Sequence, residues 1–364
     1  MKIDIRTMKG AYDNDNCFVH ARMGALNENE FVMTMQRLNR HGVDDFSLIQ
    51  VCKSFDGGKT WTAPAEEPAF AFPEKEGACW VGCDAAHRLH KKTGKLLNLC
   101  SIMVHYMGND EPTHDFPHGG GYTVYDEATG RFSPVRPLQL PQSYGYFDAF
   151  PQSCQWVELE NGDLLVPMAV RVTTAVRYAT VVVRCSFDGE TVTPLEVGNL
   201  LQYEHERGLY EPQLCEFGGK YYLTLRNDDA GYVSVSEDGL HYSEPQLWRW
   251  DTGDVLPNYN TQQHWLVCGG KLHLVYTRKA GNNDHVFRHR APLFMAEVDP
   301  ETLCVLRHTE VIVAPERGAR LGNFGVTELN ENRAVITVAE WMQPLGCEKY
   351  GSDNTIFVTF VEAE

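Results

Sequence analysis

The segment Ser54-Phe55-Asp56-Gly57-Gly58-Lys59-Thr60-Trp61 has the composition of a tight turn between two β-strands. In such a turn the Asp carboxylate accepts backbone N–H groups, the glycines take positions with φ above zero, and the tryptophan packs beneath. Weaker copies follow as Ser-Phe-Asp-Gly at 186–189 and Ser-Glu-Asp-Gly at 236–239, the second with Tyr242 in the place of the tryptophan. A turn that recurs along a chain predicts a fold built from repeated hairpins.

A longer repeat runs through the whole sequence. Its unit is an apolar strand, a turn with Gly or Asn, and a second apolar strand, which is the alternating pattern of a β-hairpin. Six copies occur at a spacing of about 50 to 70 residues, which is the size of a propeller blade. They lie at 21–34, 80–97, 155–167, 211–225, 263–276 and 323–338.

The repeat predicts the fold class. No copy is followed by a long amphipathic helix, which argues against an α/β barrel. Repeated short hairpins could also form a β-sandwich, but six similar units favour closure into a ring. We therefore predict an all-β fold, a six-bladed β-propeller of four-stranded antiparallel blades, which occupies residues 1–364 as a single domain.

The charge of the chain limits its partners. The formal net charge is −17, because 49 Asp and Glu residues outnumber 32 Lys and Arg residues. Nucleic acids and anionic membrane surfaces select basic proteins, so we expect neither as a partner. An anionic ligand would have to be held by a local cluster of arginines inside an otherwise negative molecule.

The N-terminus and the cysteines bear on the compartment. Met1-Lys2-Ile3-Asp4-Ile5-Arg6 lacks the apolar run of a signal peptide, and no stretch approaches the ~20 apolar residues of a membrane span. Eleven cysteines stand in apolar contexts without a CxxC pair. Reduced thiols in the core are therefore expected, and with them a cytoplasmic location.

The segment 54–61 fits the pattern S-x-D-x-G-x-T-W, known as the Asp-box. With its blade-sized repeat, the chain resembles the sialidase superfamily over nearly its whole length. The resemblance implies that Asp56 lies on the outer rim of a blade and has a structural role. In sialidases three arginines clamp the substrate carboxylate, an Asp is the acid/base, and a Tyr–Glu pair is the nucleophile. Arginine suits the clamp because its planar fork meets a carboxylate bidentately.

The first part of the chain carries two of these correspondences. Arg22-Met23-Gly24 matches the first-blade Arg-Ile-Pro motif of the family, with Gly in place of Pro. Asp44 and Asp45 follow at about the distance where the family keeps its acid/base, although the two could instead form a turn. The basic residues just before them suggest a loop that faces the ligand; they are Arg37, Arg40 and His41.

The second half of the chain supplies the remaining candidates. Glu211 and Arg226 bracket one hairpin, as do the family's nucleophile-assisting Glu and its second arginine, although they could be a plain surface salt bridge. For the third arginine of the clamp, Arg290 is the better candidate and Arg288 is the alternative.

The chain departs from the family at the nucleophile. The tyrosine of sialidases opens the last blade, where this sequence reads Leu-Gly-Asn-Phe-Gly at 321–325. Asn323 therefore stands near the place of the tyrosine, and the usual covalent intermediate cannot form. The resemblance implies a related fold with an altered nucleophile.

Other polar residues suggest a different chemistry. Tyr259, Gln263 and His264 lie in a dense run of Asn, Gln, Tyr and His at the entrance to the fifth repeat. Histidine is the natural acid or base near neutral pH, and some propeller lyases and rhamnosidases are similar in using His or Tyr. Further histidines lie in the second repeat, but without matching carboxylates we expect neither a catalytic metal nor a cofactor. They are His87, His90, His105, His114 and His118.

Three functions remain open from the sequence. The first is an exo-acting glycosidase for an acidic sugar, with Arg22, Arg226 and Arg290 on the carboxylate and Asp45 or Asp44 as acid/base. Glu211 would support the nucleophile or a water molecule. The second is a lyase that cleaves a uronate linkage, with His264 or Tyr259 removing the C5 proton. The third is a propeller that binds a small acidic glycan without turnover.

Overall fold

The computed structural model describes residues 1–42, 44–71, 78–106, 119–173 and 177–364. These residues form β-strands, turns and short 3-10 helices, and no α-helix occurs within the ranges given. The 3-10 helices are η1 (Pro68–Phe70), η2 (Gln142–Tyr144), η3 (Phe287–His289), η4 (Arg307–Thr309) and η5 (Cys347–Tyr350). In the same ranges no helix has the length and apolar character needed to cross a bilayer.

The strands form five hydrogen-bonded sheets. Three sheets have four strands each. The first has β2 (Asn16–Ala25), β3 (Phe31–Asn39), β4 (Phe46–Ser54) and β5 (Ala65–Glu66), and the second has β16 (Tyr210–Phe217), β17 (Lys220–Arg226), β18 (Gly231–Ser236) and β19 (Gln246–Leu247). The third has β26 (Phe324–Asn330), β27 (Arg333–Ala339), β28 (Thr355–Glu362) and β1 (Lys2–Lys9).

The other two sheets are larger. The six-stranded sheet has β20 (Arg249–Trp250), β21 (His264–Cys268), β22 (Lys271–Tyr276), β23 (Leu293–Asp299), β24 (Cys304–Val305) and β25 (Val311–Ala314). The ten-stranded sheet has β6 (Ala78–His90), β7 (Lys95–Tyr106), β8 (Gly119–Asp126), β9 (Arg131–Phe132), β10 (Arg136–Leu138), β11 (Asp148–Phe150), β12 (Val157–Glu158), β13 (Leu164–Arg171), β14 (Ala179–Phe187) and β15 (Val192–Val197).

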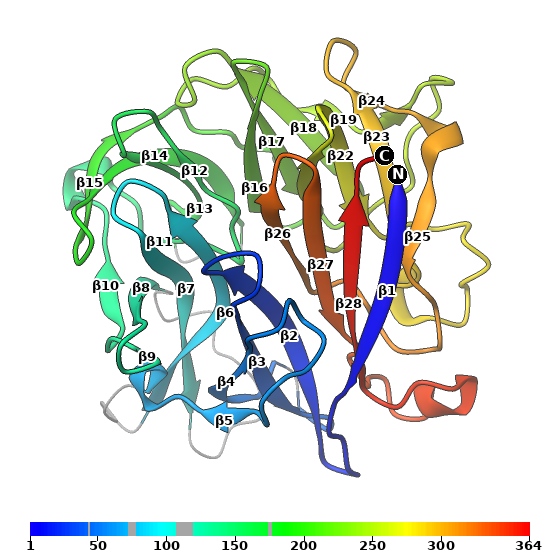
Figure 1. The fold of residues 1–364 in the computed structure, drawn as a ribbon. Coiled ribbons are helices and arrows are strands. Elements are labelled where there is room, and N and C mark those ends of the chain that lie inside the picture. Colours follow the sequence, from blue (N-terminus) through cyan, green and yellow to red (C-terminus); the bar gives the residue numbers. More distant parts are fainter. Residues whose placement is uncertain (43, 72–77, 107–118, 174–176) are drawn as a thin grey trace.

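The sheets are arranged around a common centre, as in a β-propeller (Figure 1). Strand β2 contacts β6 on one side and β26 on the other, and β16 lies between β13 and β21. Contact between β21 and β26 completes the ring. The predicted all-β propeller arrangement is therefore confirmed.

The predicted number of blades is wrong. Four sheets are separate blades, rather than the six four-stranded blades that the repeat suggested, and one of the four has six strands. The remaining strands belong to the ten-stranded sheet, where a parallel bridge between Ala149 in β11 and Gly119 in β8 joins two hairpin groups. The periodicity of the sequence predicts the number of hairpins, whereas hydrogen bonds between neighbouring groups of strands determine how many separate sheets form.

The two ends of the chain close the ring together. Strand β1 pairs antiparallel with β28 from Lys2 opposite Glu362 to Lys9 opposite Thr355, and it forms the outer strand of that sheet. The N- and C-termini consequently lie side by side (Figure 1). This pairing covers an edge of β28 that would otherwise be open.

Apolar side chains hold neighbouring sheets together. Phe31 and Met33 of β3 pack in one cluster with Val358 and Phe360 of β28, and similar clusters join the sheets of β16–β19 and β20–β25. The ten cysteines with described side chains are unpaired, and nine of them are buried. They fill space between the strands as small apolar groups.

The Ser54–Trp61 segment forms the predicted turn after β4. Asp56 Oδ1 accepts the backbone N–H groups of Lys59 and Thr60 at 3.0 and 2.9 Å, and its Oδ2 accepts the Thr60 hydroxyl at 2.6 Å. Gly57 and Gly58 have φ of 71° and 76°, which explains the two glycines. The turn of the copy at 236–239 is built the same way, with Asp238 Oδ1 accepting two backbone N–H groups.

These bonds give the Asp56 turn a defined pH dependence. Hydrogen bonds from Thr60 lower the pKa of Asp56 to about 2. A lowered pKa in the folded state stabilises the protein above the unfolded pKa of 3.8, and this contribution is lost as the pH falls towards 2. We expect Asp56→Asn to lower Tm at pH 7 by roughly 2 °C and the difference from wild type to disappear at low pH.

Thermal unfolding followed by circular dichroism between pH 7 and 2 tests this expectation. The matched control is Glu301→Gln, because Glu301 is an exposed carboxylate with no hydrogen bond to its side chain in the described part. A difference in Tm that stayed constant down to pH 2 would show that the Asp56 hydrogen bonds do not carry the effect.

Candidate active site

Charged and aromatic side chains line a cavity of about 860 Å³, which we name the charged cavity. They come from β2, the loop after β3, β6, β16, β17 and the segments that precede β23 and β26. The ionisable and basic lining residues include His20, Arg40, His41, Asp44, Asp84, Arg207, Glu211, Arg226, Asp228, Arg288, Arg290 and Arg320. Convergence of polar groups from many segments on one concave space marks the candidate active site.

Three strands carry a β-bulge where they reach the charged cavity. Shifts of pairing register occur in β2 after Val19, in β6 after Cys83 and in β16 after Tyr210. Each bulge holds a residue with left-handed backbone: His20 at φ 56°, Asp84 at 54° and Glu211 at 46°. This conformation costs a non-glycine residue about 1–2 kcal/mol, but a bulge re-aims the side chain, and all three line the cavity.

Glu211 and Arg226 meet in the charged cavity as an ion pair. Nη1 of Arg226 donates to both carboxylate oxygens of Glu211, at 2.7 and 2.8 Å. Nη2 of Arg226 donates to Asp228 at 3.3 Å. Asp228 also accepts from Arg207 and from the Tyr210 hydroxyl, both at 2.6 Å. The charge of Arg226 is thus balanced within the protein.

Arg290 and Arg320 have no such balance. Arg290 donates from Nε and Nη2 to the backbone oxygen of Asn260 and from Nη2 to its Oδ1, which also accepts from Arg226. Arg320 donates to Gln343 at 2.6 Å and stacks 4.4 Å from the centre of the Trp341 ring. The two arginines are only 5% and 8% exposed, and neither has an acidic partner within 4.0 Å in the described part of the chain.

The surroundings disfavour the charged form of both side chains. Burial, with repulsion from Arg226, lowers the pKa of Arg290. Burial lowers the pKa of Arg320 to about 10, although the nearby Asp44 carboxylate opposes this shift. At neutral pH Arg320 stays protonated, so the cavity holds buried positive charge that an anionic ligand would stabilise.

Arg22, the first arginine expected on the ligand, lies outside the charged cavity. It follows the β2 bulge and is 2% exposed. It donates to the Phe324 backbone oxygen at 3.1 Å, to Asp84 at 3.0 Å and to Gln262 at 3.4 Å. Of the three arginines expected to converge, Arg226 and Arg290 line the cavity, and Arg320 adds a further guanidinium group.

The two expected acids are placed differently. Asp44 lines the charged cavity with a left-handed backbone at φ 51°. Asp45 accepts from Asn39 at 2.8 Å and lines a separate shallow surface depression with Arg37 and His41. Arg40, from the same loop, lines the charged cavity and donates to the Met342 backbone oxygen at 3.1 Å.

The polar residues at the fifth repeat form hydrogen bonds within the protein. Gln263 accepts from Thr224 at 3.0 Å and donates to the Thr261 backbone oxygen at 3.0 Å. His264 is buried beside Gln262 at 2.6 Å, and burial lowers its pKa. The Tyr259 hydroxyl bonds to His289 at 2.6 Å. Tyr259, Gln263 and His264 are not among the residues that line the charged cavity, whereas Arg288 is, as an exposed side chain.

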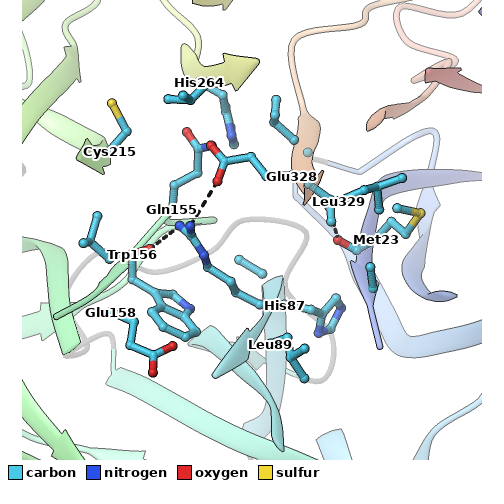
Figure 2. Close-up of a pocket in the computed structure, with 18 of the residues that line it drawn as sticks. Met23, His87, Leu89, Gln155, Trp156, Glu158, Cys215, His264, Glu328 and Leu329 are labelled. Carbon is cyan, nitrogen blue, oxygen red and sulfur yellow. Dashed lines mark hydrogen bonds and ion pairs between the residues drawn. The ribbon is translucent and has the colours of Figure 1, made fainter. Parts of the chain in front are cut away.

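A second cavity, of about 880 Å³, lies between the strands nearest the centre (Figure 2). Arg88 donates there to the Trp156 backbone oxygen at 2.6 Å and to Glu328 at 3.1 Å, while Glu158 accepts two backbone N–H groups. Because Arg22 lines this cavity and Asp84 lines the charged one, their ion pair lies between the two spaces.

Of the histidines of the second repeat, His87 and His90 have described side chains. His87 bonds to Thr34 at 2.7 Å and His90 to Thr93 at 2.8 Å. His114 and His118 lie outside the described residues, and the side chain of His105 is not described. Within the described ranges no three His, Cys, Asp or Glu side chains are grouped to hold a metal ion.

Sequence reasoning missed several lining residues, among them His20, Asp84, Arg207, Asp228 and Arg320. His20 and Asp84 stand at equivalent bulges of neighbouring inner strands, two residues before Arg22 and Ala86. Comparing the repeats position by position could have found them. Arg320 precedes β26 in an irregular segment, and no pattern in the sequence marks it.

No protein-family model matches the chain, and no curated protein matches it. Solved structures do match. A protein of unknown function from Dyadobacter fermentans is 14% identical, with a TM-score of 0.69 over 99% of both chains. Trypanosoma rangeli sialidase in complex with the inhibitor DANA is 15% identical, with a TM-score of 0.65 over 98% of this chain and 59% of that one. NanB sialidase from Streptococcus pneumoniae is 11% identical, with a TM-score of 0.65 over 97% and 70%.

The chain therefore has a sialidase-like β-propeller fold. It spans 59% of the length of the Trypanosoma sialidase chain, and at these identities the likeness concerns the fold alone.

The contrast between Arg22 and Arg320 can be measured as stability. Arg22→Met leaves the Asp84 carboxylate without its partner, so we expect a loss of about 3–5 kcal/mol in the free energy of unfolding. Arg320→Met removes a buried charge that lacks an acidic partner, so the stability should stay within about 1 kcal/mol of wild type or exceed it. Urea unfolding of the ligand-free protein measures both. Equal destabilisation by the two substitutions would mean that the charge of Arg320 is compensated.

Proposed function

We propose that the protein is an exo-acting glycoside hydrolase for a small sugar that carries a carboxylate. The observation that carries the proposal is the pair of buried guanidinium groups, Arg290 and Arg320, without acidic partners in the described part. A substrate carboxylate would balance this charge and meet the planar donors of arginine. The cavity volume of about 860 Å³ suits one small ligand and so supports an exo mode of action.

Arg226 and Arg290 would hold the substrate carboxylate from one side. Both donate to Oδ1 of Asn260, at 3.3 and 3.0 Å, so their guanidinium groups already converge on one acceptor. Arg320 would face them in the same cavity, and Arg288 would contribute from its exposed position. Arg22 is assigned a positioning role instead, because it does not line the charged cavity and it holds Asp84, which does.

Asp44 is the proposed acid that protonates the leaving oxygen. It lines the charged cavity, whereas Asp45 is held by Asn39 outside it. Glu211 would orient Arg226 through its two short hydrogen bonds.

An altered nucleophile is part of the proposal. Asn323, near the place of the family's tyrosine, lines the cavity, and an amide is a poor nucleophile. Tyr210 does not replace it, because its hydroxyl donates to Asp228 at 2.6 Å and burial raises its pKa.

Two other functions make different predictions. A uronate lyase would need a base beside the sugar; the two bases named from the sequence, His264 and Tyr259, do not line the charged cavity, so this function would have to use another base. A glycan-binding propeller would bind without turnover, and Glu211→Gln would leave its affinity intact. Ionisable groups such as Asp44 and Glu211 in the cavity favour the hydrolase over the binding protein.

The proposal is tested with 4-nitrophenyl glycosides of acidic sugars, among them N-acetylneuraminic, glucuronic and galacturonic acid. We expect release of nitrophenol from at least one of them and from none of the matched neutral glucosides and galactosides. Arg290→Met and Arg320→Met should each lower kcat/KM by about ten- to a hundred-fold, since a hydrogen bond to a charged group contributes about 1.5–3 kcal/mol.

The matched control is Arg317→Met, because Arg317 pairs with Glu340 and does not line the charged cavity. Equal hydrolysis of neutral and acidic glycosides would contradict the proposal. A rise in ultraviolet absorbance with uronate oligosaccharides would identify a lyase, and binding of the free acids without any turnover would identify a glycan-binding protein.

A further inference from the structure

We propose that His20 is the general base that activates a water molecule for attack on the anomeric carbon, with Asp84 stabilising the imidazolium that results. This inference rests on the proposed function and names the group that takes over from the missing nucleophile. His20 contacts Asn323, the residue that stands near the place of the tyrosine, at 3.2 Å.

The fold holds His20 in one orientation at the wall of the charged cavity. Its ring centre lies 4.8 Å from that of Phe46 and 5.4 Å from that of Trp341. The β2 bulge gives it a left-handed backbone at φ 56°, and the side chain is 4% exposed while lining the cavity. Strain of this kind persists only where the surrounding structure fixes the residue.

The hydrogen bonds of Gln36 define the tautomer of His20. The Gln36 Nε2 group donates to the backbone oxygens of Ser47 at 3.1 Å and Gly82 at 3.3 Å, which fixes the orientation of the amide. Its Oε1 therefore faces His20 Nδ1 at 3.3 Å and must accept from it. The proton of the neutral imidazole is then on Nδ1, and Nε2 has a free lone pair.

The lone pair on Nε2 points toward the groups of the cavity. Asn323 Nδ2 donates to it at 3.2 Å, and Asp84 Oδ1 lies 3.7 Å away. A water molecule that displaced the Asn323 amide could donate to the same lone pair. An unprotonated nitrogen within reach of the substrate space is the geometry that a general base requires.

The charges around His20 suit a base that is neutral before reaction. Burial lowers the pKa of His20, the Arg22 guanidinium lowers it further, and the Asp84 carboxylate opposes the shift. Burial opposes the ionisation of Asp84, but the Arg22 guanidinium beside it helps to hold the pKa of that carboxyl below its usual value. When Nε2 takes a proton, the Asp84 carboxylate is the nearest negative charge, and Arg22 holds it in place at 3.0 Å.

The reaction balances with these groups. One O–H bond of water breaks, its proton moves to His20 Nε2, and its oxygen bonds to the anomeric carbon. The glycosidic C–O bond breaks in the same step, and the leaving oxygen takes the proton of Asp44. The protein returns to its starting state when the imidazolium loses its proton and Asp44 regains one through solvent. A single displacement by water inverts the anomeric configuration.

The test uses wild type and His20→Gln on the acidic 4-nitrophenyl glycoside that wild type cleaves best. We expect His20→Gln to lower kcat by about 10²–10⁴-fold with little change in KM, because a general base acts on the chemical step. In wild type kcat/KM should fall on the acid side with a pKa below 6.5, since burial lowers it from that value. That limb should vanish in the variant.

Two measurements separate catalysis from folding. The matched control is His273→Gln, since His273 is equally buried, bonds to the Leu266 backbone oxygen at 3.2 Å and does not line the charged cavity. It should keep wild-type turnover. If His20→Gln does not fold, added imidazole should restore turnover to His20→Ala. The stereochemistry of the wild-type reaction tests the role of His20 without any variant.

Proton NMR of the first sugar released by wild type should show inversion. Retention of configuration, or a His20→Gln enzyme with near-wild-type kcat, would overturn the role of His20 while leaving the hydrolase proposal standing. If wild type cleaves no acidic glycoside, or gives an unsaturated product, the hydrolase proposal fails and the role of His20 falls with it.

Discussion

The ion pair between Arg22 and Asp84 ties the first sheet of the propeller to the second. Arg22 comes from β2 and Asp84 from β6, and the two charges meet at 3.0 Å where both strands bulge. The pair lies between the second cavity and the charged cavity, so the wall that the candidate site shares with the second cavity depends on it. Additional bonds from Arg22 reach the Phe324 backbone in the neighbouring β26 and Gln262 in the segment before β21.

The charged cavity differs from the rest of the molecule in how its charges are balanced. Outside the cavity the buried Arg171 meets the carboxylate of Asp148, and within it Arg226 meets Glu211. Arg290 and Arg320 meet only amides, a backbone oxygen and aromatic rings in the described structure. A chain with a net charge of −17 therefore keeps a concentrated positive region in one cavity. An acidic ligand would be drawn to this region and not to the surrounding surface.

How far the sequence predicts the site depends on how local each feature is. Glu211 and Arg226 lie at the open ends of one hairpin, so their spacing alone places them together. Arg290 was inferred from the family pattern. His20, and not Arg22, lines the charged cavity, because the β2 bulge inserts one extra residue between Val19 and Arg22. A one-residue shift in a strand exchanges its two faces, and nothing local in the sequence marks the shift.

By itself the sequence determined the all-β propeller arrangement and the turn around Asp56, because alternating strands and glycine turns act over a few residues. Tertiary structure decided the number of separate blades, since the parallel bridge between Ala149 and Gly119 joins two hairpin groups into one sheet. It also decided that Arg290 and Arg320 have no acidic partner among the described residues and that His20 lines the charged cavity. These properties depend on distances between residues such as His20 and Asn323, which are 303 positions apart, and only the closed ring brings them together.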